Sequence, residues 1–131
     1  MDETRAAGAK PILLAPLVRR SWDKGNPGKN RSTLAPYAEA VRKLATAKEV
    51  LLVDLHAPSQ ELCESLGPEK CLAFSPMTKV DGPNRVDNTH LNAQGSLKFA
   101  ALVLAELCRI MPDIMPYFRE AGQTAVRVES K

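Results

Sequence analysis

Apolar residues gather in two short runs, 11–18 and 50–55, separated by one amphipathic segment. Each run is too short for a helix pair and rich in branched side chains, which indicates a buried strand. Between them, apolar residues recur every three or four positions, which predicts a helix with one buried stripe, capped by Ser32 or Thr33. The stripe consists of Leu34, Tyr37, Ala38, Val41, Leu44 and Ala45. The order strand, helix, strand predicts a right-handed parallel βαβ unit with both strands buried on both faces.

Turn-forming residues divide the rest of the chain. Helices are predicted over 2–9, over 59–66 with a stop at Gly67-Pro68, and from an Asn92 cap to the proline at 112. The segments 19–32 and 75–88 are rich in Gly, Pro, Asn and charged residues and predict long loops. Only two strands result, and a two-stranded parallel sheet is not a stable domain. Either further strands come from elsewhere, or the chain is a piece of a larger doubly wound fold that begins in mid-helix.

Composition agrees with one globular α/β unit. The chain has 131 residues, of which 44% are hydrophobic and 25% charged, and a net charge of +3. These values exclude a multidomain enzyme and do not by themselves indicate a polyanionic partner. No apolar run approaches the ~18 residues of a membrane span, and the start lacks the order of a signal peptide. We therefore expect no membrane contact.

Cysteine usage argues against a disulfide scaffold. The three cysteines, Cys63, Cys71 and Cys108, form no Cys-x-x-Cys pair, so buried free thiols are expected. A Cys63–Cys71 bridge is the alternative for a secreted protein. The two histidines are scattered relative to these thiols, so we expect neither a metal site nor a cofactor.

The segment 87–92 reads Asp-Asn-Thr-His-Leu-Asn and contains the most specific candidate catalytic residues. In a single turn, Asp87 can reach Nδ1 of His90, fix its tautomer and stabilise the imidazolium, which leaves Nε2 free to take a serine proton. The alternative is that Asp87 only forms a turn and His90 is a surface residue ahead of a helix.

The order of these segments resembles the C-terminal half of the GDSL/SGNH hydrolase superfamily, in particular the rhamnogalacturonan acetylesterase-like carbohydrate esterases. The resemblance covers roughly 10–117, and its most specific element is Asp-x-Thr-His-Leu-Asn followed by Gly95. It implies a flavodoxin-like three-layer α/β fold with a parallel sheet whose N-terminal strands are missing here. It also implies that Asp87 and His90 are catalytic. We accordingly expect a partial hydrolase domain over 1–118 and a polar C-terminal tail over 119–131.

Such enzymes carry their serine in a Gly-Asp-Ser block and an oxyanion asparagine in a Gly-x-Asn-Asp block, and this sequence has neither. None of the seven serines lies in Gly-Asp-Ser or Gly-x-Ser-x-Gly. The isolated chain is therefore expected to be inactive, because the nucleophile and oxyanion donors would lie outside it.

Five cations fall within 19–31 against one acid. Loops at the carboxyl ends of strands line the ligand crevice in open α/β sheets, so Arg19 and Arg20 are candidate contacts for an anionic, pectin-like substrate. Trp22 is a candidate for stacking on a sugar ring. The alternatives are a solvated loop for the cations and a packing role for Trp22. Nucleic acid is not expected, because aromatic interleaving and a binding motif are missing.

The sequence therefore predicts the C-terminal part of a serine esterase that deacetylates a polysaccharide or a small acetyl ester. One alternative is a non-catalytic module that self-associates through its incomplete sheet edge. Another is a truncated product without a separate function. Localisation stays open, because the related enzymes are often secreted.

Overall fold

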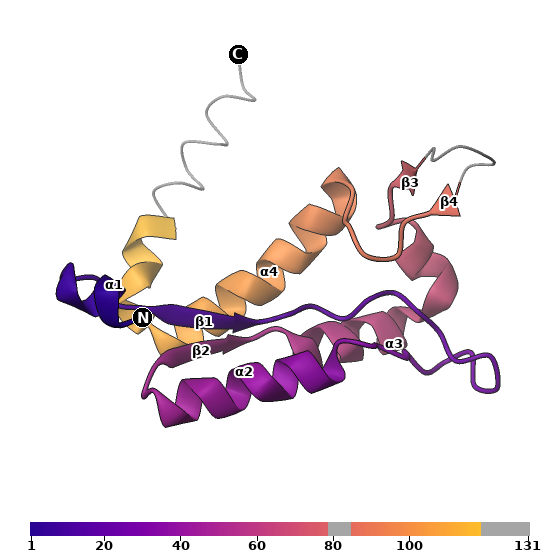
Figure 1. The fold of residues 1–131 in the computed structure, drawn as a ribbon. Coiled ribbons are helices and arrows are strands. Elements are labelled where there is room, and N and C mark those ends of the chain that lie inside the picture. Colours follow the sequence, from indigo (N-terminus) through magenta and orange to yellow (C-terminus); the bar gives the residue numbers. More distant parts are fainter. Residues whose placement is uncertain (79–84, 119–131) are drawn as a thin grey trace, which may run out of the picture.

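The computed structural model describes residues 1–78 and 85–118. In chain order its elements are α1 (Asp2–Ala6), β1 (Ile12–Ala15), α2 (Ala35–Ala47), β2 (Leu51–Asp54), α3 (His56–Leu72), β3 (Met77–Thr78), β4 (Arg85–Val86), α4 (Ala93–Ile110) and the 3-10 turn η1 (Pro112–Ile114) (Figure 1). The expected polar tail, 119–131, and residues 79–84 of the turn-rich segment lie outside the described residues.

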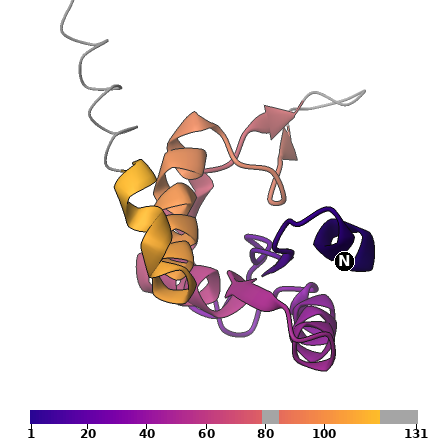
Figure 2. The same ribbon diagram turned by 90° about the vertical axis from the view of Figure 1, so that its left-hand side faces the viewer.

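The two predicted strands pair in parallel, with Ile12 opposite Leu51 and Ala15 opposite Asp54. Helices α2 and α4 lie on opposite sides of this pair (Figures 1 and 2). The predicted α/β class and the strand, helix, strand order with parallel pairing are confirmed. The predicted burial of both strand faces is wrong, because Leu14 is 53% exposed and Leu51 is exposed as well. Among the described residues the sheet has two strands, so these leucines lack a covering neighbour.

Helix α2 buries less than its sequence stripe predicts. Ala38 and Ala45 are buried, whereas Tyr37 is 65% exposed and Leu44 is also exposed. A two-stranded sheet covers only a narrow band of the helix, so the small residues at its centre are buried and the large ones at its edges are not. The predicted capping by Ser32 or Thr33 is wrong as well, because the N-cap is Leu34 and makes no side-chain cap bond.

Helix α3 is longer than predicted and broken at the predicted stop. It begins at His56 and continues to Leu72, but Gly67 has φ 77° and ψ 171°, which interrupts the helix. Glycine adopts this conformation readily, and Pro68 starts the second helical segment, where its missing N–H costs nothing. The Gly-Pro pair therefore redirects the helix instead of ending it.

The hydrophobic core lies at the carboxyl ends of the strands, between α3 and α4. Its buried members are Val18, Cys63, Cys71, Phe74 and Phe99. The Phe74 and Phe99 rings meet edge to face with centroids 6.0 Å apart. No helix in the described parts of the chain has the length and apolarity to cross a membrane.

The segment 75–88 contains a short antiparallel pair that the sequence does not reveal. Met77 of β3 lies opposite Val86 of β4. Each strand has two residues, which is too few to show a period in the sequence. Strand β4 ends at Val86, so Asp87 follows it directly and lies in the connection to α4. Figure 1 shows this connection from β4 to α4.

Candidate active site

Asp87 and His90 meet in one tight turn between β4 and α4. The Asp87 Oδ1 atom accepts hydrogen bonds from the backbone N–H groups of Thr89 at 2.8 Å and His90 at 2.9 Å. The Oδ2 atom lies 2.7 Å from His90 Nδ1. The contact that the spacing predicts is therefore present, and the catalytic role of the pair stays a prediction.

The surroundings of the turn keep Asp87 ionised and His90 accessible. Hydrogen bonds from the His90 backbone and ring and from the Thr89 backbone lower the pKa of Asp87 to about 2. The His90 side chain is 78% exposed, and Nδ1 is occupied by Asp87. The open ring nitrogen is therefore Nε2, the one that a general base requires.

The next residues clamp this turn to the end of α3. Asn92 is the predicted cap of α4, and its Oδ1 accepts from Gly95 N at 2.9 Å. Its Nδ2 donates to Ala73 O at 2.7 Å, and its backbone N–H donates to Phe74 O at 3.0 Å. A Cβ on Gly95 would lie 2.7 Å from Phe74 O, so only glycine permits this close approach.

Arg20 lies beneath the turn and is 6% exposed. Its Nη2 donates to the carbonyl oxygens of Asp87, at 3.0 Å, and of His90. Its Nε donates to Ser75 Oγ at 2.9 Å. Desolvation by burial lowers the pKa of Arg20. The guanidinium thus contacts the main chain of the site turn, and a substrate contact by Arg20 stays a prediction.

The other loop cations do not form the single patch that their clustering in the sequence suggests. Lys29 forms an ion pair with Glu64, with 3.0 Å between Nζ and Oε2. Arg19 is half-buried, and its Nη1 lies 3.4 Å from Thr33 Oγ1. Lys24 and Arg31 are exposed on the loop. Arg19 remains a predicted substrate contact.

Trp22 is half-buried against the hydrophobic core and lines a cavity of about 280 Å³. Arg20 and Ser75, which support the site turn, and Val86, which precedes it, also line this cavity. Trp22 therefore packs against the core, as one of the two interpretations of the sequence predicts. Its stacking on a sugar stays a prediction.

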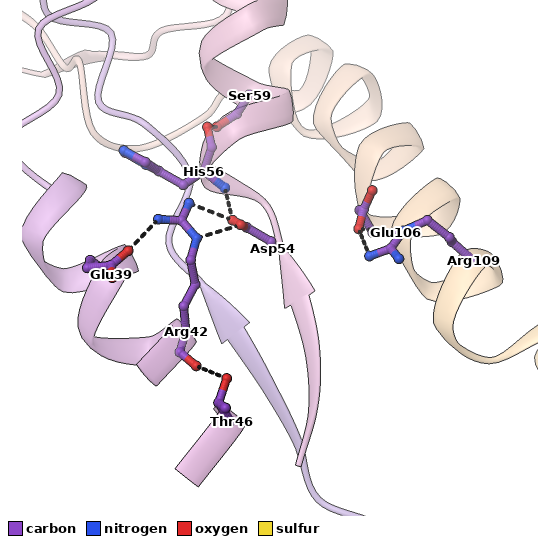
Figure 3. Close-up of polar contacts among 8 residues, drawn as sticks. All are labelled: Glu39, Arg42, Thr46, Asp54, His56, Ser59, Glu106 and Arg109. Carbon is purple, nitrogen blue, oxygen red and sulfur yellow. Dashed lines mark hydrogen bonds and ion pairs between the residues drawn. The ribbon is translucent and has the colours of Figure 1, made fainter. Parts of the chain in front are cut away.

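A second polar cluster joins α2, β2 and α3 (Figure 3). Arg42 Nε lies 2.7 Å from Asp54 Oδ2, and Asp54 Oδ1 accepts from the His56 backbone N–H at 3.1 Å. Burial alone would raise the pKa of Asp54, but the hydrogen bonds from Arg42 and His56 lower it. His56 is buried with the first turn of α3. The cluster connects the elements structurally, and we assign it no chemical role.

Cys63 and Cys71 are buried free thiols. Cys71 Sγ donates to Cys63 O at 3.6 Å, and burial raises the pKa of Cys63 to about 12. Such a thiol stays protonated and unreactive at neutral pH. Within 1–78 and 85–118, no group of three His, Cys, Asp or Glu side chains is placed to hold a metal ion.

Sequence reasoning identifies the Asp87–His90 pair and the Asn92 cap but misses the residues beneath them. Arg20 contacts Asp87 and His90 across 67 and 70 positions of the chain, and its partner Ser75 is 55 positions from it. No local pattern signals such contacts. The clustering of cations in 19–31 predicts a substrate contact for Arg20 and not a contact with the turn.

Comparisons with known proteins agree with the predicted resemblance, although no family model matches the chain. The chain is 33% identical over 107 residues to rhamnogalacturonan acetylesterase RhgT of Bacillus subtilis strain 168, which covers 78% of this chain and 45% of the relative. It superposes on the crystal structure of Bacillus subtilis protein YXIM with a TM-score of 0.65 and 29% identity, over 82% of this chain and 28% of that one. The chain thus spans less than half the length of the curated relative that it matches. These matches confirm the predicted resemblance: the chain is homologous to part of a rhamnogalacturonan acetylesterase.

Proposed function

We propose that the chain carries the proton-transfer half of a serine esterase site that deacetylates a carbohydrate. The observation that carries this proposal is the 2.7 Å contact between Asp87 Oδ2 and Nδ1 of His90, whose ring is otherwise exposed. His90 acts as general base and acid, and Asp87 orients it. The partial homology to a rhamnogalacturonan acetylesterase supports an ester as the substrate.

In the proposed reaction, His90 Nε2 takes the proton of a serine hydroxyl while the serine oxygen attacks the acetyl carbonyl. The imidazolium then returns the proton to the departing sugar oxygen, which leaves an acetyl-enzyme. A water molecule repeats the sequence and releases acetate. Asp87 is ionised throughout the neutral pH range, so it stabilises the imidazolium at both stages.

The nucleophile is expected from a segment outside this sequence. The resemblance implies a Gly-Asp-Ser block, and the chain contains none. Two buried serines already have other partners: Ser59 Oγ accepts from Val18 N at 3.0 Å, and Ser75 Oγ accepts from Arg20. These contacts argue against Ser59 and Ser75 as the nucleophile.

The substrate that we propose is an acetylated, pectin-like polysaccharide or a small acetyl ester. The name of the relative supports the carbohydrate, and the exposed Lys24 and Arg31 are cations that an anionic polymer can approach. Trp22, Arg19 and Arg20 remain the proposed contacts from the sequence. Substrate choice depends on loops, so the polymer is a proposal by analogy.

A chimera tests the function. The matched segment of RhgT is replaced by this chain, and release of acetate from acetylated rhamnogalacturonan is measured. We expect turnover, with a loss of about a thousandfold or more in His90→Ala and in Asp87→Asn. Thr89→Ala is the matched control, because Thr89 lies in the same turn and its hydroxyl bonds only the neighbouring Asn88 in the described chain. The isolated chain should show background hydrolysis.

Two results would overturn the proposal. Undiminished turnover in the His90→Ala chimera would remove His90 as the base. Turnover by the isolated chain, lost in His90→Ala, would place the nucleophile within this sequence.

The exposed strands favour a second candidate function, which is self-association through the sheet. Leu14 and Leu51 present apolar surface on the two-stranded sheet of the described residues. Light scattering over a concentration series tests it, since association predicts a mass that rises with concentration. A cooperatively folded monomer at every concentration would exclude this function.

A further inference from the structure

We propose that Arg20 is the positioning residue of the Asp87–His90 pair, acting through the main chain of the turn that joins them. This inference rests on the proposed function, because it concerns the same pair. Arg20 is expected to set the alignment of the imidazole and to take no part in proton transfer itself.

The contacts of Arg20 enclose the turn on its inner side. Its Nη2 donates to the carbonyl oxygens of both end residues, Asp87 and His90, and its backbone N–H donates to Asn88 O at 2.9 Å. One residue therefore satisfies the carbonyls of positions 87, 88 and 90. A free Asp-x-x-His turn has only its own short hydrogen bonds to keep it closed. By drawing positions 87 and 90 to one nitrogen, Arg20 fixes the separation of the two side chains.

Arg20 is itself held rigidly. Ser75 Oγ accepts from Nε at 2.9 Å, and Ser75 directly follows the Phe74 that packs in the core. A buried cation is costly unless its donors are satisfied, so the guanidinium has little freedom to leave these partners. The core therefore restrains the turn through Ser75 and Arg20.

The planar guanidinium is essential to this arrangement. Its Nε and Nη2 point in fixed, diverging directions, one toward Ser75 and the other toward the turn. A lysine ammonium has the charge but no such fork, and it sits at a single point. Arg20→Lys therefore separates the role of geometry from the role of charge.

The experiment reads the ring of His90 directly by ¹⁵N NMR of the whole chain at alkaline pH. In the wild type we expect the tautomer with its proton on Nδ1, bound to Asp87. In Arg20→Met and Arg20→Lys we expect the Nε2–H tautomer to become the major form. Asp87→Asn is the positive control, and Arg31→Met is the matched control, because Arg31 is an exposed arginine of the same loop.

A milder variant keeps the test decisive if an Arg20 variant does not fold. Ser75→Ala removes one hydrogen bond of Arg20 and leaves the cation and the turn sequence intact. We expect a smaller shift in the same direction. A purely structural role predicts lower thermal stability in these variants with an unchanged tautomer. Folded Arg20→Lys or Ser75→Ala with the full wild-type tautomer population would overturn the proposal.

The result is distinguishable from a failure of the proposed function. A tautomer shift in the Arg20 variants, together with an active His90→Ala chimera, would retain the positioning role and reject the esterase base. An unchanged tautomer, together with an inactive His90→Ala chimera, would reject the positioning role and retain the base.

Discussion

The sheet side of the molecule, formed by the strand pair and α2, differs from the turn that leads into α4. The sheet side leaves large apolar side chains exposed, whereas the polar groups of the turn are hydrogen-bonded. On the sheet side, large apolar residues such as Leu14 and Tyr37 face solvent. At the turn, Asp87, Arg20 and Asn92 each make two or more hydrogen bonds. The candidate site is therefore held by more specific contacts than the outer surfaces of the sheet and α2.

The difference indicates where stability resides. A cluster of buried apolar residues lies under the turn, between α3 and α4, whereas the sheet side buries Val53 and the small side chains of Ala38 and Ala45. Substitutions of buried residues near the turn should therefore cost much more than substitutions of the exposed apolar residues on the sheet side. Four predictions test this contrast.

Phe99→Ala should have the largest effect. Phe99 is buried and packs edge to face on Phe74. Removing the ring leaves a cavity and lowers the free energy of unfolding by about 3–5 kcal/mol, measured by urea denaturation. Leu97→Ala is the control, because Leu97 is an exposed apolar residue of the same helix. Equal losses for both would mean that the core is not where the structure places it.

Gly95→Ala should come next. Alanine normally favours a helix, but its Cβ would lie 2.7 Å from Phe74 O and 2.9 Å from Phe74 Cβ. Overpacking of this kind lowers the free energy of unfolding by about 1–3 kcal/mol. Ser96→Ala, at the exposed neighbouring position, should be nearly neutral. A stabilised Gly95→Ala protein would show that α4 can move away from Phe74 without cost.

Acid should weaken the turn through Asp87. Its pKa is about 2 in the folded chain against an ordinary value of 3.8, so its contribution to stability is complete above about pH 4. That contribution is lost as the pH falls toward 2. The difference in unfolding free energy between wild type and Asp87→Asn should therefore shrink over this range, measured by denaturation at several pH values. A constant difference from pH 2 to 6 would contradict the assignment.

Leu14→Ala should have the smallest effect. Leu14 is exposed on β1, so its truncation should change the free energy of unfolding by less than about 0.5 kcal/mol. Val53→Ala is the contrast, because Val53 lies on the adjacent strand and is fully buried. A large loss in Leu14→Ala at high protein concentration only would indicate that another copy covers the strand.

Local patterns predicted much of this molecule. The two strands, the Asn92 cap and the contact of Asp87 with His90 depend on residues a few positions apart, whose spacing carries the information. The homology adds the family resemblance and leaves the roles of the site residues as predictions.

The misses have a common physical cause. Burial of Leu14, Tyr37 and Leu44 requires neighbours that a local pattern cannot guarantee, and the described residues do not provide them. The hydrogen bonds of Arg20 to the turn depend on how distant segments meet, as does its burial. The early start of α3 at His56 depends on an Asp54 carboxylate that accepts the His56 backbone N–H.

The hydrogen bonds of Arg20 also bear on the order of folding. They join positions separated by 55, 67 and 70 residues, so the chain must close very long loops before any of them forms. Contacts of such separation slow folding and assemble late. The backbone N–H of Arg20, which donates to Asn88 O, should accordingly gain protection from hydrogen exchange only after α2 and the paired strands have formed.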